Sequence, residues 1–265
     1  MQILFLGVGE ACDEREGNTA LLVRSSPQSP AGLALLDCGF TAAHRFFAFC
    51  ADRDALELVW LSHFHGDHFF GLPLLLLRLW EEGRRRPLVV CGPPGVERVV
   101  PQAFELAYPG LLPRLGFPLQ LTPIPDGGAM CLAGFTLATA ASEHSAMNLA
   151  LRLDDGHQAI YYSGDGRPNA ACLALARGCQ LIVHEAFALQ DPPAGHGSVT
   201  GALDFARQAG ARICALVHLA RHSRRQRHAL TALTTSTGDL AVLLPATNDL
   251  LTLPGGFLRS AEPCC

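Results

Sequence analysis

Three histidines and an aspartate fall within six residues of the sequence, at His63, His65, Asp67 and His68. They follow the apolar run 56–61, which is typical of a buried strand, and a glycine and a leucine-rich helical pattern come next. This order places the four side chains on a tight loop at the carboxyl end of a strand. Imidazole and carboxylate groups are ligands that Zn²⁺ takes readily, and Mn²⁺ or Fe²⁺ can use the same set. A solvated loop could also hold clustered histidines, but the spacing His-x-His-x-Asp-His is far more specific and predicts a metal site.

Three later residues of the same chemical type each come just after an apolar, strand-like segment: His144, Asp165 and His218. A single such residue is more often a helix cap or a core histidine. Three of them downstream of the first cluster predict more ligands than one ion needs. We therefore expect a site for two metal ions.

Hydrophobic periodicity predicts the elements that position these residues. Strands are expected at 2–6, 19–24, 33–36, 56–61, 88–91, 119–124, 135–140, 149–153, 159–163, 181–184, 213–217, 241–244 and 250–253. Helices are expected at 42–51, 71–82, 96–107, 169–177, 199–208 and 224–235. Two runs of strands, each followed by helices and not separated by a Ser-, Gly- or charge-rich linker, predict one α/β domain over residues 1–265. Its two sheets would pack together with helices outside, in four layers.

The composition restricts the class of protein. Apolar residues make up 49% of the chain, which is enough for a large core and argues against long disorder. The net charge of −4 argues against a broad nucleic-acid surface. The ten cysteines include no Cys-x-x-Cys, and the start of the chain has neither a basic segment nor a long apolar run, so a reduced, cytoplasmic protein without membrane attachment is expected. The terminal pair Cys264-Cys265 is interpreted as a tail without function rather than a lipidation or metal-capture site.

Three polar features have more than one interpretation. Asp37, at the end of the strand 33–36, could hold a metal ligand from behind or cap the following helix. The run Arg84 to Arg86 is interpreted as a solvated loop rather than a phosphate site. The arginines at positions 221, 224, 225 and 227 could meet an anionic substrate or simply begin a solvated helix.

Several motifs along nearly the whole chain share one pattern: Phe5-Leu6-Gly7-Val8-Gly9 with Asn18, Leu36-Asp37-Cys38-Gly39, Ser62-His63-Phe64-His65-Gly66-Asp67-His68 with Gly71-Leu72-Pro73, Cys91-Gly92-Pro93, His144, Ser163-Gly164-Asp165, His184-Glu185-Ala186-Phe187, His196 with Ser198, and Val217-His218. In these motifs and their order, the chain resembles the metallo-β-lactamase superfamily and, within it, the ribonuclease Z-like phosphodiesterases. The resemblance implies the four-layer αββα sandwich of that superfamily.

The resemblance also implies a role for each site residue. His63, His65 and His144 would bind the first divalent ion, Asp67, His68 and His218 the second, and Asp165 would bridge them. Zn²⁺ is the expected metal, with Mn²⁺ or Fe²⁺ as alternatives. Catalytic roles fall to Asp67, to His196 as proton donor and to Glu185, which would orient His196. Two divalent ions about 3.5 to 4 Å apart can hold a hydroxide between them and clamp the oxygens of a displacement at phosphorus.

The substrate is less well defined than the site. The tRNA-processing relatives carry a long basic arm between the third metal histidine and the bridging aspartate, and the short interval from His144 to Asp165 has no room for one. Gly166 and the segment 219–222 also depart from the ribonuclease pattern. We therefore expect a small or cyclic phosphodiester or a short nucleotide, not a long nucleic acid. The alternatives are another ester (a sulfate ester, lactone or thioester) and a metal-binding sensor without catalysis, and the relatives make a homodimer a further expectation.

Overall fold

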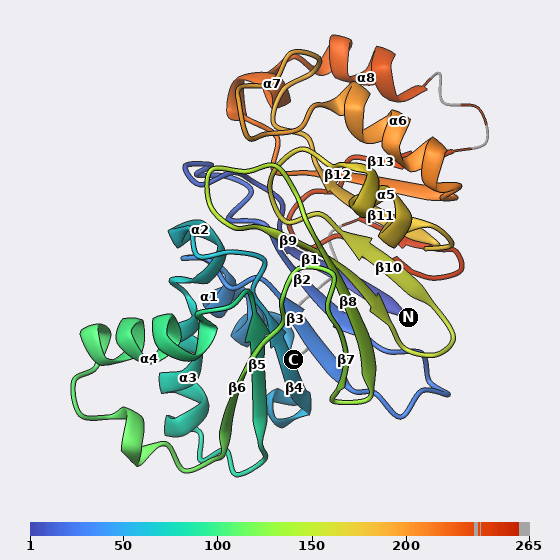
Figure 1. Ribbon diagram of the computed structural model, residues 1–265. Helices are drawn as coiled ribbons and strands as arrows, with labels where there is room; N and C mark the ends of the chain where they lie inside the picture. The colour runs from blue at the N-terminus through green and yellow to red at the C-terminus, as the bar shows by residue number, and fades with distance from the viewer. Residues whose placement is uncertain (236–237, 239, 260–265) are drawn as a thin grey trace.

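Two β-sheets face each other and carry helices on their outer surfaces (Figure 1). The computed structural model describes residues 1–235, 238 and 240–259, so the Cys264-Cys265 tail lies outside the described residues. The first sheet has the strand order β15-β14-β1-β2-β3-β4-β5-β6, and the second has the order β13-β12-β11-β10-β9-β8-β7. This arrangement is the four-layer αββα sandwich that the sequence predicts.

The strands of the first sheet are β1 (Gln2–Gly7), β2 (Ala20–Arg24), β3 (Leu33–Leu36), β4 (Leu56–Trp60), β5 (Leu88–Gly92), β6 (Leu119–Pro123), β14 (Leu250–Thr252) and β15 (Phe257–Leu258). Those of the second are β7 (Ala129–Leu132), β8 (Phe135–Ala141), β9 (Leu149–Asp154), β10 (Ala159–Tyr162), β11 (Leu181–Glu185), β12 (Ile213–Val217) and β13 (Ala241–Leu243). The outer helices are α1 (Ala42–Phe49), α3 (Leu72–Glu81) and α4 (Val96–Ala107) on the first sheet, and α5 (Ala170–Ala176), α6 (Val199–Ala209) and α8 (Arg227–Thr235) on the second. The short helices α2 (Gly66–Phe69) and α7 (Arg221–Arg225) lie in connecting loops.

Three apolar cores hold the layers together. The central core fills the space between the sheets and includes the fully buried Trp60, Phe135 and Tyr162. The outer cores pack the helices on each sheet, as Phe46 of α1 does on one side and Phe205 of α6 on the other. Six of the eight cysteines in the described part of the chain are buried, as expected of small apolar side chains.

Parallel strands in both sheets end at the same edge of the sandwich. β3 pairs in parallel with β4 in the first sheet, and β10, β11 and β12 pair in parallel in the second. The loops that leave these strands carry most of the histidines and carboxylates singled out above, and His144 follows β8. The carboxyl ends of parallel strands are where open α/β sheets build ligand sites.

Several elements differ from the sequence-based prediction, and the short strand β15 and the short helix α2 were not predicted. Strand β7 was not predicted either, because four mostly exposed residues give little periodic signal. It forms a hairpin with β8 through Ala133 and Gly134, which both have positive φ. The helix expected at 224–235 is broken at Gln226 into α7 and α8. Among the described residues, no helix has the length and apolar character that a membrane crossing requires.

The prediction of a solvated loop at Arg84 to Arg86 is wrong for its first residue. Arg84 is only 2% exposed. Its guanidinium donates to the carbonyl oxygens of Arg53, Leu56, Arg86 and Pro87, at 2.6–3.2 Å. These carbonyls lie in the turn before β4, at the first residue of β4 and in the loop before β5, so the side chain supplies hydrogen-bond donors where two strands begin. Arg85 and Arg86 are exposed as predicted.

Replacing Arg84 should therefore lower stability. We expect Arg84→Met to reduce the free energy of unfolding by about 1–3 kcal/mol, because buried carbonyls lose their donor. Urea unfolding followed by circular dichroism measures this change. The matched variant Arg85→Met removes an exposed side chain that makes one hydrogen bond, to the Gly116 carbonyl. Its free energy of unfolding should stay within about 0.5 kcal/mol of the wild-type value. Equal losses in both variants would contradict this role for Arg84.

Candidate metal centre

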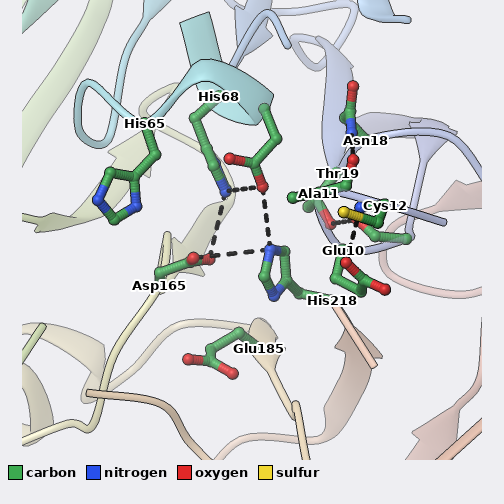
Figure 2. Close-up of polar contacts among 12 residues, drawn as sticks. Glu10, Ala11, Cys12, Asn18, Thr19, His65, His68, Asp165, Glu185 and His218 are labelled. Carbon is green, nitrogen blue, oxygen red and sulfur yellow. Dashed lines mark hydrogen bonds and ion pairs between the residues drawn. The ribbon is translucent and has the colours of Figure 1, made fainter. Parts of the chain in front are cut away.

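All seven side chains that the sequence assigns to metal binding lie together at the carboxyl edge of the sandwich. They form one group of His63, His65, His144 and Asp165, and a second group of Asp67, His68 and His218. Within each group the candidate ligand atoms lie within 4.8 Å of one another. Figure 2 shows His68, Asp165 and His218 turned toward a common centre, with dashed lines joining them and with His65 to one side.

The spacing of the donor atoms suits a metal ion better than a set of direct hydrogen bonds. His68 Nε2 lies 3.3 Å from Asp67 Oδ2 and 3.4 Å from Asp165 Oδ1. His218 Nε2 lies 3.4 Å and 3.6 Å from the same two carboxylates. Nitrogen and oxygen ligands at tetrahedral zinc, with bonds near 2.0–2.2 Å, are roughly 3.3–3.6 Å apart.

In the first group, the separations are similar. His144 Nε2 lies 3.2 Å from His65 Nδ1, and the Nε2 atoms of His63 and His144 each lie 3.9 Å from Asp165 Oδ2. Asp165 thus contacts both groups, through two oxygens of one buried carboxylate. A carboxylate placed in this way can be shared between two cations.

Buried atoms without a partner support the same interpretation. Among the described residues, His63 Nε2, His68 Nε2 and Asp165 Oδ1 are buried and have no hydrogen-bond partner. Burying such atoms unpaired costs about 1–3 kcal/mol each, and native structures seldom accept this cost. Divalent ions held by the two groups would satisfy all three atoms, so the residues fit the metal that the sequence predicts.

Other contacts orient the rings of three of the histidines, so that Nε2 faces the cluster. The Ser62 hydroxyl donates to Asp37, so its oxygen accepts the Nδ1 hydrogen of His63 at 3.0 Å. His68 Nδ1 donates to Asp37 Oδ2 at 2.7 Å, and His144 Nδ1 donates to the Gly195 carbonyl at 2.6 Å. In each case the Nε2 lone pair is left for the cluster. Such partners orient metal-binding histidines and tune their basicity.

The open interpretation of Asp37 is thereby resolved, because its side chain holds His68 and caps no helix. Asp37 is fully buried and accepts hydrogen bonds from His68, from the Ser62 backbone and hydroxyl, and from Tyr162. Asp37 and His218 also adopt the left-handed conformation, with φ of 60° and 55°. Uncommon backbone angles of this kind gather at functional sites.

The charges of the cluster shift the pKa values of its members in opposite directions. Burial and the neighbouring His68 hold the pKa of His63 well below its usual value, which favours the neutral imidazole that can offer a lone pair to a metal ion. Burial alone would lower the pKa of His68, but the carboxylates of Asp165 and Asp37 outweigh it and raise that pKa. Burial would raise the pKa of Asp165, but the nearby histidines His218 and His68 hold it well below the usual range. A divalent cation would supply the positive charge that these carboxylates attract.

Asn148 positions Asp165, and the sequence analysis did not identify it. The Asn148 side chain accepts from the backbone N–H of Asp165 and donates to the Ser163 carbonyl and the Ser142 hydroxyl. Asn148 is fully buried between β8 and the loop that follows β10. No local pattern could have revealed it, because an asparagine at the end of a loop, directly before a strand, is also a common turn residue.

His196 and Glu185 form a pair beside the cluster. His196 Nδ1 lies 3.1 Å from Glu185 Oε1, and the His196 ring stacks on Phe187 at 4.5 Å between centroids. Glu185 is fully buried and also accepts from the backbone N–H groups of Gly166 and Phe187. The hydrogen bond to Glu185 raises the pKa of His196 against the opposing effect of burial. The shift favours protonation of His196 relative to a free imidazole, which is the direction that a proton donor needs.

Two of the arginines after His218 contact the loop that follows β1. Arg221 Nε lies 2.7 Å from Glu10 Oε1, and Arg224 donates to the Val8 carbonyl and lies 3.5 Å from Asp13. Glu10 belongs to the loop that Figure 2 shows beside the cluster. These acidic partners neutralise Arg221 and Arg224, which favours the interpretation as a structural contact over an anion site.

Removing the support behind His68 should weaken metal binding. We expect Asp37→Asn to lower Zn²⁺ affinity about 10- to 100-fold, because a neutral amide oxygen is a weaker acceptor for His68 than the carboxylate, and the amide NH₂ would face the Ser62 N–H that Oδ1 now accepts. Competition with a chromophoric chelator measures this affinity. The matched variant Asp52→Asn changes an exposed carboxylate and should leave it unaltered. Unchanged affinity in Asp37→Asn would rule out the supporting role.

The chain matches known proteins over most of its length. Residues 34–219 match the family model described as "Beta-lactamase superfamily domain". Ribonuclease BN of Escherichia coli strain E24377A is 28% identical over 273 residues, covering 83% of this chain and 89% of that protein.

Solved structures share the fold. The human short-form tRNase Z superposes with a TM-score of 0.75 at 21% identity, covering 96% of this chain and 100% of that one. The metallo-β-lactamase fold protein YhfI from Bacillus subtilis does so with a TM-score of 0.75 at 19% identity, covering 95% and 99%. The chain therefore belongs to the beta-lactamase superfamily, as a hydrolase with the metallo-β-lactamase fold and with ribonuclease Z-type relatives.

Proposed function

We propose that this protein is a phosphodiesterase that uses two divalent metal ions, with Zn²⁺ as the expected metal. The observation that carries the proposal is the pair of donor groups that share the Asp165 carboxylate, at separations suited to metal ligands. His63, His65 and His144 would hold one ion, and Asp67, His68 and His218 the other. Ions bound there would lower the pKa of coordinated water toward ~7 and stabilise charge on the oxygens of the scissile group.

The residues around the ions have separate tasks in this proposal. His196, held by Glu185 and stacked on Phe187, would donate a proton to the leaving oxygen. Its ring lies 5.2 Å from that of His144 and 6.0 Å from that of His218, so it faces the place where an ester would sit between both groups. Arg167 holds the loop of His196 by donating to the carbonyls of Pro192, Pro193 and His196.

A phosphodiester is preferred over other esters for two reasons. A protonated histidine aimed at the site suits an ester whose leaving oxygen is basic. The curated relative is a ribonuclease and one structural neighbour is a tRNase, and both kinds of enzyme cleave phosphodiesters. The short His144 to Asp165 interval and the net charge of −4 favour a small substrate over a long nucleic acid.

Metal content and turnover test the proposal directly. We expect the purified protein to bind close to two Zn²⁺ or Mn²⁺ ions per chain and to hydrolyse bis(p-nitrophenyl) phosphate, and chelation should abolish both. Elemental analysis and p-nitrophenolate absorbance provide the two measurements. Sulfate-ester, lactone and thioester substrates should be hydrolysed far more slowly by the same preparation. A fully metal-loaded protein without phosphodiesterase activity would falsify the proposal.

His196 should affect turnover without affecting metal binding. For a phosphodiester with an alkoxide leaving group, we expect His196→Ala to reduce kcat by about 10²- to 10⁴-fold, as the loss of a general acid does. The loss should be smaller with p-nitrophenolate, a weakly basic leaving group that needs little protonation. Metal content should equal that of wild type.

The matched control is His222→Ala, which removes an exposed histidine on α7. It should retain full activity on both substrates. Loss of metal from His196→Ala, or equal losses of kcat on both leaving groups, would show that His196 has another role.

A further inference from the structure

His218 differs from three other histidines of the cluster in how its ring is held. The Nδ1 atoms of His63, His68 and His144 each form a hydrogen bond with a neighbouring group. The Nδ1 atom of His218 is buried and has no hydrogen-bond partner within the described part of the chain. A bond to this second ring nitrogen is what usually orients a metal-binding histidine. The position of the His218 ring therefore depends on its backbone.

The backbone of His218 is held in an uncommon conformation by the segment that follows β1. Its φ of 55° lies in the left-handed region, where a residue other than glycine stays only if surrounding contacts fix it. The His218 N–H donates to the Val8 carbonyl at 2.8 Å, and the next residue, Leu219, forms a β-bridge with Gly9. Figure 2 shows the loop that continues from this segment beside His218.

Arg224 of α7 donates to the same carbonyl. Its guanidinium lies 3.0 Å from the Val8 oxygen, so this oxygen accepts from both Arg224 and the His218 N–H. Val8 is fully buried, and a hydrogen bond from a charged donor is stronger than one from a neutral donor. Arg224 thus fixes the acceptor that holds the backbone of His218.

Asp13 anchors Arg224 from the other side. Its Oδ2 atom lies 3.5 Å from the Arg224 Nε atom, and its Oδ1 atom accepts the backbone N–H groups of Arg15 and Glu16 at 3.0 and 3.2 Å. A Cβ added to Gly9 would lie 2.6 Å from the Asp13 Cβ, so a side chain cannot fit between them. The loop therefore holds this carboxylate in place, and the carboxylate holds the guanidinium over the Val8 carbonyl.

We propose that Arg224 is a positioning residue for the second metal ion, and that it acts by holding the Val8 carbonyl and, through it, the backbone of His218. This inference rests on the proposed function, because it takes two ions to bind. His218 shares a donor group with Asp67 and His68, and the first donor group contains none of the residues that Arg224 contacts. Arg224 therefore affects the affinity of one ion and not that of the other.

Stepwise metal binding tests this role without any turnover. Metal-free protein would be titrated with Zn²⁺ in competition with a chromophoric chelator, which resolves two binding steps. We expect Arg224→Met to weaken one step about 10- to 100-fold, as the loss of a residue behind a metal ligand does, and to leave the other step unchanged. The weakened step should be the one that His218→Ala abolishes. Co²⁺ bound in that step should also change its visible absorption, which reports the geometry of the ligands.

Two further variants separate positioning from a general loss of structure. Arg225→Met is the matched control, because it removes the exposed neighbouring arginine of α7, and it should keep both affinities. Arg224→Lys keeps a positive charge and one donor for the Val8 carbonyl, so it should recover part of the lost affinity. Equal weakening of both steps in Arg224→Met, or two unchanged steps, would overturn the proposal.

The proposed function fails in a different way. A wild type that binds two ions with this dependence on Arg224 but hydrolyses no phosphodiester would refute the proposed function and leave the role of Arg224 standing. A wild type that binds two ions and hydrolyses phosphodiesters, with Arg224→Met identical to it in metal binding, would refute only the role of Arg224. A wild type that binds a single ion would refute the two-ion site and this inference with it.

Discussion

Asp165 places a buried carboxylate between histidines from both sheets, and the rest of the site depends on how that charge is compensated. A buried ionised group is stable only with opposite charge and hydrogen bonds around it. His68 and His218 lie 3.4 and 3.6 Å from the oxygens of Asp165, distances that are too long for good hydrogen bonds and close to those between ligands of one ion. The cluster therefore suits divalent metal binding, which would change its energetic balance.

The two sheets are needed together to make this arrangement. Asp37 and the loop from His63 to His68 leave the first sheet, whereas His144, Asp165, Glu185 and His218 leave the second. The central core that contains Trp60 and Tyr162 sets the distance between them. Tyr162 joins the two layers directly, since its hydroxyl donates to Asp37 across the interface at 2.6 Å. Packing and site geometry are coupled through this contact.

The residues that surround the cluster differ in chemical character from one side to the other. His196 and the loop held by Arg167 lie on one side, and the loop that contains Glu10 pairs with the arginines of α7 on another. The exposed rings of Phe40 and Phe70 border the metal loop. The metal chemistry is common to the fold, so this rim is where a preference for one ester over another has to arise.

The sequence by itself determined the fold class, most of the strands and helices, and the identity of every residue in the cluster. It could do so because the spacing His-x-His-x-Asp-His and the ligand-type residues at later strand ends are local patterns. The tertiary structure alone decided how Asp37 acts, that Asn148 holds Asp165, that Arg84 is buried, and that Phe40 and Phe70 meet. The physical reason is that each of these contacts joins segments distant in the chain or depends on close backbone packing. No periodicity or spacing in the sequence records such contacts.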